Sequence, residues 1–167
     1  MQIKKEEFEK LLEMIPPYPK TNIFHLNNFD LTSSKILFEF CKANDYDYDL
    51  VSSDEDFLEK LKEFDATKLT IKQPRYNRHA KLYDYVFLTI DLDDIDHQKL
   101  FFTKVYHICK NSAKILIFLE NGYHNELEQL LEELNFVASN YIDISQNYKV
   151  LSVQKMHSNL TKISKEE

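Results

Sequence analysis

The stretch Asp84-Tyr85-Val86-Phe87-Leu88-Thr89-Ile90 decides the fold of this chain. Apolar side chains occupy nearly every position from Val86 to Ile90, rather than every second one. A strand of this kind is buried on both faces, which is typical of a parallel sheet that carries helices on each side. Residues 115–119, Ile-Leu-Ile-Phe-Leu, repeat the pattern. The two runs predict an α/β fold.

Strand and helix patterns alternate along the rest of the chain. Strands are predicted at residues 22–26, 48–52, 68–72, 84–90, 113–119, 136–144 and 149–153, and helices at 3–15, 33–43, 54–64, 96–110 and 126–134. The predicted N-cap of the second helix is Thr32 or Ser33, and that of the third is Ser53 or Asp54. Only Ser145-Gln146-Asn147 and its flanks join the last two strands, so these must pair antiparallel. The sequence therefore predicts a Rossmann-like, seven-stranded, mostly parallel sheet with helices on both faces and an antiparallel C-terminal strand pair.

The chain divides into three regions. Residues 1–20 form a helix and a proline-rich linker, residues 21–156 form the main domain, and residues 157–167 form a polar tail. The first helix has an apolar stripe at helical spacing, made of Phe8, Leu11, Leu12 and Ile15. This stripe needs a partner, which is either the core of the main domain or another subunit.

Composition excludes several functions. Gly122 is the single glycine, so the chain has no glycine-rich loop to approach a phosphate and no nucleophile elbow. The net charge of −7 argues against a nucleic-acid surface, which requires clustered basic residues. No apolar run is long enough for a membrane span. Cys41 and Cys109 fall in apolar helical patterns and are expected to be buried free thiols, so we expect a cytoplasmic protein.

Three segments resemble those of class I S-adenosylmethionine-dependent methyltransferases. Leu82-Tyr83-Asp84-Tyr85-Val86-Phe87-Leu88 resembles the fourth strand of that family, and Asn135-Phe136-Val137 resembles the entry to its sixth strand. Asn28-Phe29-Asp30-Leu31 is similar to a degenerate glycine loop of the spermidine-synthase-like branch. The resemblance covers residues 21–156 and implies that the last strand is inserted antiparallel beside the fifth.

The resemblance implies S-adenosylmethionine as the cofactor, with Asn28, Asp30 and Asp54 as the contacts. Asp56 matches the acidic position after the second strand as well as Asp54 does, and both are also explained as residues that cap or begin a helix. The loop at residues 25–30 lacks the family's glycines, and His25 would plug it. The link at 73–83 has no helical pattern, so that side of the pocket would be thin.

Asp91 is the candidate catalytic residue. It follows the fourth strand, where related transferases place groups that contact the substrate, and it would orient an amine or a hydroxyl as a general base. The alternative is a solvated loop over residues 91–97 with Asp94 or Asp96 as the N-cap of the next helix. Six histidines show no ligand spacing, so no metal site is expected.

Arg75 and Arg78 are the two arginines of a chain that otherwise uses lysine. A guanidinium binds a carboxylate or a phosphate with two parallel hydrogen bonds, which lysine cannot do. The loop at residues 73–79 is therefore a candidate for anion or partner binding. The alternative is an ion pair with the chain's own acids, for example Asp91, Asp93 or Asp94.

These observations favour a degenerate methyltransferase-like domain that is non-catalytic and acts as a binding or dimerising subunit. The alternative is an active transferase that uses S-adenosylmethionine or its decarboxylated form and moves a methyl or aminopropyl group to a small or cationic substrate. A third hypothesis is a docking module whose interface, with a protein partner or a second copy, is the N-terminal helix and the Arg75–Arg78 loop.

Overall fold

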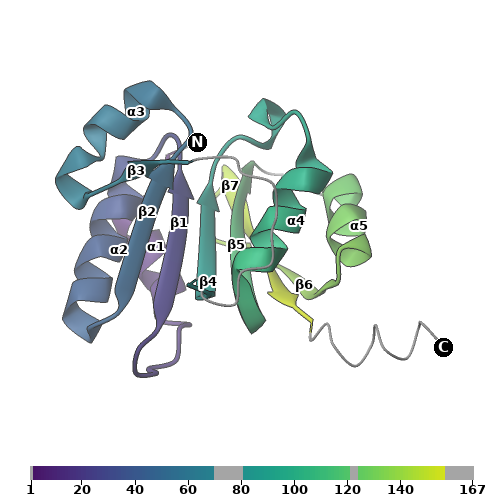
Figure 1. Cartoon of the computed structure of the whole chain (residues 1–167), viewed down its shortest axis with the longest axis horizontal. Helices are drawn as coiled ribbons and strands as arrows, with labels where there is room; N and C mark the ends of the chain where they lie inside the picture. Colours follow the sequence, from purple (N-terminus) through teal and green to yellow (C-terminus); the bar gives the residue numbers. More distant parts are fainter. Residues whose placement is uncertain (1, 70–80, 121–123, 157–167) are drawn as a thin grey trace.

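The computed structural model describes residues 2–69, 81–120 and 124–156. Its seven-stranded sheet has the order β3-β2-β1-β4-β5-β7-β6 (Figure 1). The strands are β1 (Asn22–Asn27), β2 (Asp47–Ser52), β3 (Thr67–Lys68), β4 (Tyr83–Thr89), β5 (Cys109–Glu120), β6 (Phe136–Asp143) and β7 (Tyr148–Lys155). The helices are α1 (Lys5–Leu12), α2 (Leu31–Asn44), α3 (Glu55–Lys60), α4 (Gln98–Ile108) and α5 (Asn125–Glu133), with 3-10 turns η1 (Lys62–Phe64) and η2 (Leu92–Asp94).

The topology confirms the predicted fold class. The strands β1 to β5 are parallel, and β7 lies between β5 and β6 and is antiparallel to both. Strand order reverses between β1 and β4, because the chain passes from β1 outward to β2 and β3 and then returns to the other side of β1. Ligands of open α/β sheets bind at such a switch point, beyond the carboxyl ends of the strands.

Helices cover both faces of the sheet, as predicted (Figure 1). On one face, α1 and α2 bury a cluster that includes Phe8, Leu37 and Phe87. Beside them, α3 packs over β2 through a smaller cluster of Leu50, Phe57 and Leu61. On the opposite face, α4 and α5 cover a larger cluster that contains the alternate strand residues, among them Leu26, Val86, Leu88, Ile115, Ile117 and Leu151.

The first helix packs on the sheet. The Phe8 side chain is fully buried, and its ring centroid lies 5.9 Å from that of Phe87 and 5.8 Å from that of Phe118. Tyr148 donates a hydrogen bond to Glu7 Oε2 at 3.2 Å, which also ties α1 to β7. The sequence left two partners open for the apolar stripe of this helix, the core of the main domain or another subunit. The structure shows that the stripe packs against the core.

Several predicted boundaries are wrong. The first helix ends at Leu12 instead of residue 15, although Ile15 remains buried. The fifth strand begins at Cys109 instead of residue 113, because Cys109 pairs with Tyr83 at the start of β4. The third strand is seen at Thr67–Lys68, earlier than predicted, and residues 70–72 of that prediction lie outside the described residues.

The N-cap residues confirm the prediction at α3 and contradict it at α2 and α4. Asp54 caps α3, as predicted. The N-cap of α2 is Asp30, not Thr32 or Ser33. The N-cap position of α4 is His97, which makes no side-chain capping hydrogen bond, so Asp94 and Asp96 do not cap this helix. Asp30, Thr32 and Ser33 are all good cap formers. The hydrogen bond from the Asp30 backbone N–H to Asn27 fixes the loop so that Asp30 is the cap.

Cys41 and Cys109 are free and buried, which confirms the prediction for both thiols. Burial raises the pKa of each to about 12, so both stay protonated near neutral pH. Within the described part of the chain, none of the helices combines the length and the apolar character that a bilayer crossing needs.

Candidate functional site

The site predicted from the sequence lies where β1, β2 and β4 end. The segments that follow these strands begin at Asn28, Ser53 and Ile90, and they share one edge of the sheet. The switch point between β1 and β4 lies at the same edge. Three residues that follow or end these strands, Asn28, Ser52 and Thr89, therefore set the geometry of the crevice expected at this edge.

Asn28 bridges the strand ends at this edge with its side chain and its backbone. Its amide oxygen accepts hydrogen bonds from the Ser52 hydroxyl and from the Ser53 backbone N–H, both at 2.9 Å. Its amide nitrogen donates to Ser53 Oγ at 2.7 Å. Its backbone N–H donates to the Thr89 carbonyl at 3.0 Å. One residue therefore ties the end of β1 to the ends of both neighbouring strands.

Buried side chains also hold the loop after β1 through hydrogen bonds. The buried Asn27 accepts a hydrogen bond from the Asp30 backbone N–H at 3.0 Å and donates to Ser34 Oγ at 2.7 Å. Asp30 in turn accepts from the Ser33 backbone N–H at 2.7 Å and is only 6% exposed. No residue from 26 to 31 has a positive φ, which explains why this loop forms without glycine.

The predicted site residues Asp54 and Asp91 lie on the rim and are exposed. Asp54 Oδ1 accepts from the Phe57 backbone N–H at 3.0 Å at the start of α3. Asp91 Oδ1 accepts from the Asp93 backbone N–H at 3.0 Å at the start of η2. Asp56 lies in the first turn of α3 and is exposed. Each of the four predicted site residues Asn28, Asp30, Asp54 and Asp91 is thus used to shape its own loop.

His25 lies inside the sheet instead of in the loop that it was predicted to plug. It is fully buried in β1, with Nδ1 2.7 Å from the Tyr48 hydroxyl and Nε2 2.8 Å from Thr89 Oγ1. Thr89 Oγ1 donates to the Leu26 carbonyl, so it can accept a hydrogen bond from His25 Nε2–H. With the proton on Nε2, His25 Nδ1 accepts from the Tyr48 hydroxyl. Burial lowers the pKa of His25 to about 3, which keeps the ring neutral.

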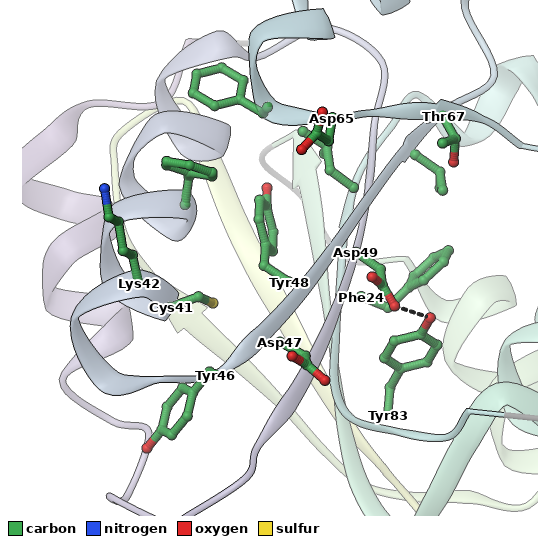
Figure 2. A pocket seen from close by; sticks show the side chains of 14 residues that line it. Phe24, Cys41, Lys42, Tyr46, Asp47, Tyr48, Asp49, Asp65, Thr67 and Tyr83 are labelled. Atoms are coloured by element: carbon green, nitrogen blue, oxygen red, sulfur yellow. Dashed lines mark hydrogen bonds between the residues drawn. The ribbon is translucent and has the colours of Figure 1, made fainter.

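A groove that the sequence did not reveal lies beside β2. Its cavity volume is about 580 Å³, and it includes Phe24 of β1, Phe38 of α2, and Asp47 and Asp49 of β2. Figure 2 shows side chains on both sides of the strand, with the Tyr83 hydroxyl directed at Asp49. That hydrogen bond is 2.6 Å long. The repeat Tyr46-Asp47-Tyr48-Asp49 is the sequence signal that could have indicated it.

Arg75 and Arg78 lie outside the described residues. Among residues 2–69, 81–120 and 124–156, no cluster of three or more histidine, cysteine or acidic side chains has the arrangement of a metal site.

Comparisons with solved structures agree on one fold. A SAM-dependent methyltransferase from Aquifex aeolicus is similar with a TM-score of 0.64 and 10% identity, over 88% of both chains. A TehB-like SAM-dependent methyltransferase from Corynebacterium glutamicum matches with a TM-score of 0.63 and 11% identity, over 90% of this chain and 87% of the other. The [4+2]-cyclase SpnF matches with a TM-score of 0.67 and 6% identity, over 92% and 81%.

Other methyltransferase chains of this fold are longer, and this chain spans about half of their length. No protein-family model matches the sequence, and no curated protein matches it. At such low identity the likeness establishes the fold alone. The chain has the class I S-adenosylmethionine-dependent methyltransferase-like fold, as the sequence predicted. The similarity to the spermidine-synthase-like branch stays a prediction.

Proposed function

We propose that this chain is a degenerate methyltransferase-like domain that does not catalyse methyl transfer and acts as a binding subunit. One observation carries the proposal: the Asn28 side chain, just after β1, makes three hydrogen bonds to Ser52 and Ser53 at the end of β2, and its backbone N–H bonds to Thr89 at the end of β4. In the resembling family, a glycine loop at this place leaves room for the cofactor. Here a Cβ and an amide fill that room.

The hydrogen bonds of Asn28 make this closure stable. Each of its three side-chain hydrogen bonds stabilises the closed loop by roughly 0.5–1.5 kcal/mol, and opening the loop would also expose or strand the buried Ser52 hydroxyl. A bound nucleoside would have to replace all of these contacts. These contacts support the proposal that S-adenosylmethionine does not bind in this crevice, and we derive no catalytic step through it.

The alternative is an active S-adenosylmethionine-dependent transferase. It is favoured by the exposed carboxylates of Asp54 and Asp91 at the rim, and by structural neighbours that are described as S-adenosylmethionine-dependent methyltransferases. In that case Asp54 would hold the cofactor and Asp91 would act on the substrate. The fold also occurs in a [4+2]-cyclase, so it does not dictate methyl transfer.

Calorimetric titration separates the two functions. The protein is titrated with S-adenosylmethionine, S-adenosylhomocysteine and the decarboxylated cofactor, and the expected result is a Kd weaker than about 1 mM for all three. A Kd of about 1–100 µM for any of them that rises at least tenfold in Asp54→Ala, but not in Glu133→Ala, which alters an exposed carboxylate at the end of α5, would overturn the proposal.

The binding role leaves the partner open. We propose that the exposed side of α1 and the Arg75–Arg78 loop contribute to an interface with a protein partner or a second copy of the chain. We also propose a cytoplasmic location, where the two buried cysteines stay reduced.

A further inference from the structure

We propose that the groove beside β2 binds an extended, basic segment of a partner protein, which adds to the sheet as a new strand. We call the groove, with its walls of Phe24, Phe38, Asp47, Asp49, Phe64 and Tyr83, the β2 groove. The proposal rests on the binding role proposed above, because it names the chemistry of the partner. The β2 groove lies along the edge of the sheet and not at the crevice closed by Asn28, so the two proposals can fail separately.

Within the described residues, the first part of strand β2 has an open edge. β3 pairs only with Val51 and Ser52, so among the described residues the stretch from Asp47 to Leu50 has no strand partner on that side. The Asp47 backbone N–H donates to Thr21 on the β1 side, and the Ser52 carbonyl accepts from Leu69 on the β3 side. Backbone groups alternate along a strand, so Tyr48 directs its N–H and C=O to the open edge.

The β2 groove has walls on both faces of the sheet. On the α2 face, the rings of Phe38 and Phe64 lie 5.4 Å apart and form an apolar wall. On the opposite face, Asp47 and Asp49 lie beside Tyr83 (Figure 2). An added strand presents its side chains alternately to the two faces, which matches a groove that wraps around a strand edge.

The charged wall already accepts an ammonium group. Lys81 Nζ lies 2.9 Å from Asp49 Oδ2, 3.4 Å from Asp47 Oδ2 and 5.7 Å from the centre of the Tyr83 ring. The Tyr83 hydroxyl donates to the same oxygen of Asp49, so within the described residues the second oxygen is left for another donor. The Asp47 side chain is 69% exposed, so it is also accessible to a donor. This wall therefore favours lysine or arginine.

The two walls together define the partner. Its residues alternate between basic side chains, which face Asp47 and Asp49, and apolar side chains, which face Phe38 and Phe64. The open stretch from Asp47 to Leu50 is about 13 Å long at about 3.3 Å per residue, so it fits a segment of about four to six residues. So short a strand predicts weak binding, with a Kd of about 100 µM.

The probe is the hexapeptide acetyl-(Lys-Val)3-amide, and binding is followed by ¹⁵N NMR of the whole chain. Two further peptides carry N-methyl groups on the lysines or on the valines. In an added strand only one of these two sets of N–H groups bonds to the protein, so we expect one methylated peptide to lose binding at least tenfold and the other to retain it. Shifts and slower amide exchange are expected at Tyr48.

The charge requirement is tested in the protein. Asp47→Asn combined with Asp49→Asn should weaken binding about fivefold to tenfold, whereas Asp56→Asn, an exposed carboxylate on α3, should leave it unchanged. Circular dichroism melting confirms that the variants fold. Equal binding of the two methylated peptides, equal effects of the aspartate variants, or no binding at all would each overturn the proposal.

Discussion

The amide oxygen of Asn28 lies 2.9 Å from the hydroxyl oxygen of Ser52, which is fully buried and donates a hydrogen bond to it. The two residues are 24 positions apart in the sequence and end neighbouring strands of the sheet. Their contact joins the ends of β1 and β2 at the edge of the sheet where ligands of open α/β folds bind. Its strength can be measured independently of any activity.

Asn28→Ala should lower the free energy of unfolding by roughly 1–3 kcal/mol, because it removes the nearer of two acceptors of the buried Ser52 hydroxyl, together with the two hydrogen bonds to Ser53. Urea denaturation measures the change. The control is Asn147→Ala, which alters an exposed side chain in the turn before β7 and should change the free energy by less than about 0.5 kcal/mol. A loss of similar size in both variants would show that the Asn28 contacts do not stabilise the loop.

His25 should make the protein less stable in acid. Its pKa is near 6.5 in the unfolded chain and about 3 in the folded protein, because burial disfavours the charged ring. The unfolded state therefore binds the extra proton as the pH falls, so this contribution is complete above pH 6.5 and is lost between pH 6.5 and pH 3. The slope is roughly 1.4 kcal/mol per pH unit within that window.

His25→Gln removes this titration and should flatten the pH dependence of stability between about pH 6 and pH 4. Urea denaturation at several pH values gives the slopes, and the exposed His97→Gln provides the control. Parallel curves for the wild type and His25→Gln would mean that His25 is not held neutral by its surroundings.

Phe8→Ala tests whether α1 belongs to the core. The side chain is fully buried between Phe87 and Phe118, so its removal should lower the free energy of unfolding by about 3–5 kcal/mol. Met14, which is 58% exposed, supplies the matched variant Met14→Ala with little expected effect. A Phe8→Ala protein as stable as the wild type would mean that α1 is a separable attachment.

The proposed interface at Arg75 and Arg78 depends on the planar guanidinium. Arg75→Lys combined with Arg78→Lys keeps the charge but removes the paired hydrogen bonds, so it should weaken self-association or partner capture at least tenfold. Sedimentation and pull-down experiments measure the two effects, and Lys99→Arg on α4 is the control for an exposed cation elsewhere. Unchanged assembly and partner capture in the double variant would rule out recognition that depends on the guanidinium groups of Arg75 and Arg78.

Local patterns in the sequence predicted the elements because each depends on neighbouring residues. The apolar run in β4 and the stripe of α5 report burial directly, and the cap of α3 by Asp54 spans three positions. The same locality explains the errors. Asp30, Thr32 and Ser33 are equivalent as cap formers in the sequence, and only the contact between Asn27 and Asp30 selects the first of them.

The sequence by itself determined the α/β order, the antiparallel strand pair at the end and the lack of a glycine loop, because all three follow from residue type and short spacing. The tertiary structure decided what fills the crevice and what lies beside β2. Asn28 forms hydrogen bonds with Ser52 and Thr89, and His25 forms one with Tyr48. These bonds exist only because strands far apart in the chain lie side by side in the sheet. Such contacts depend on strand order and register, which no local pattern encodes.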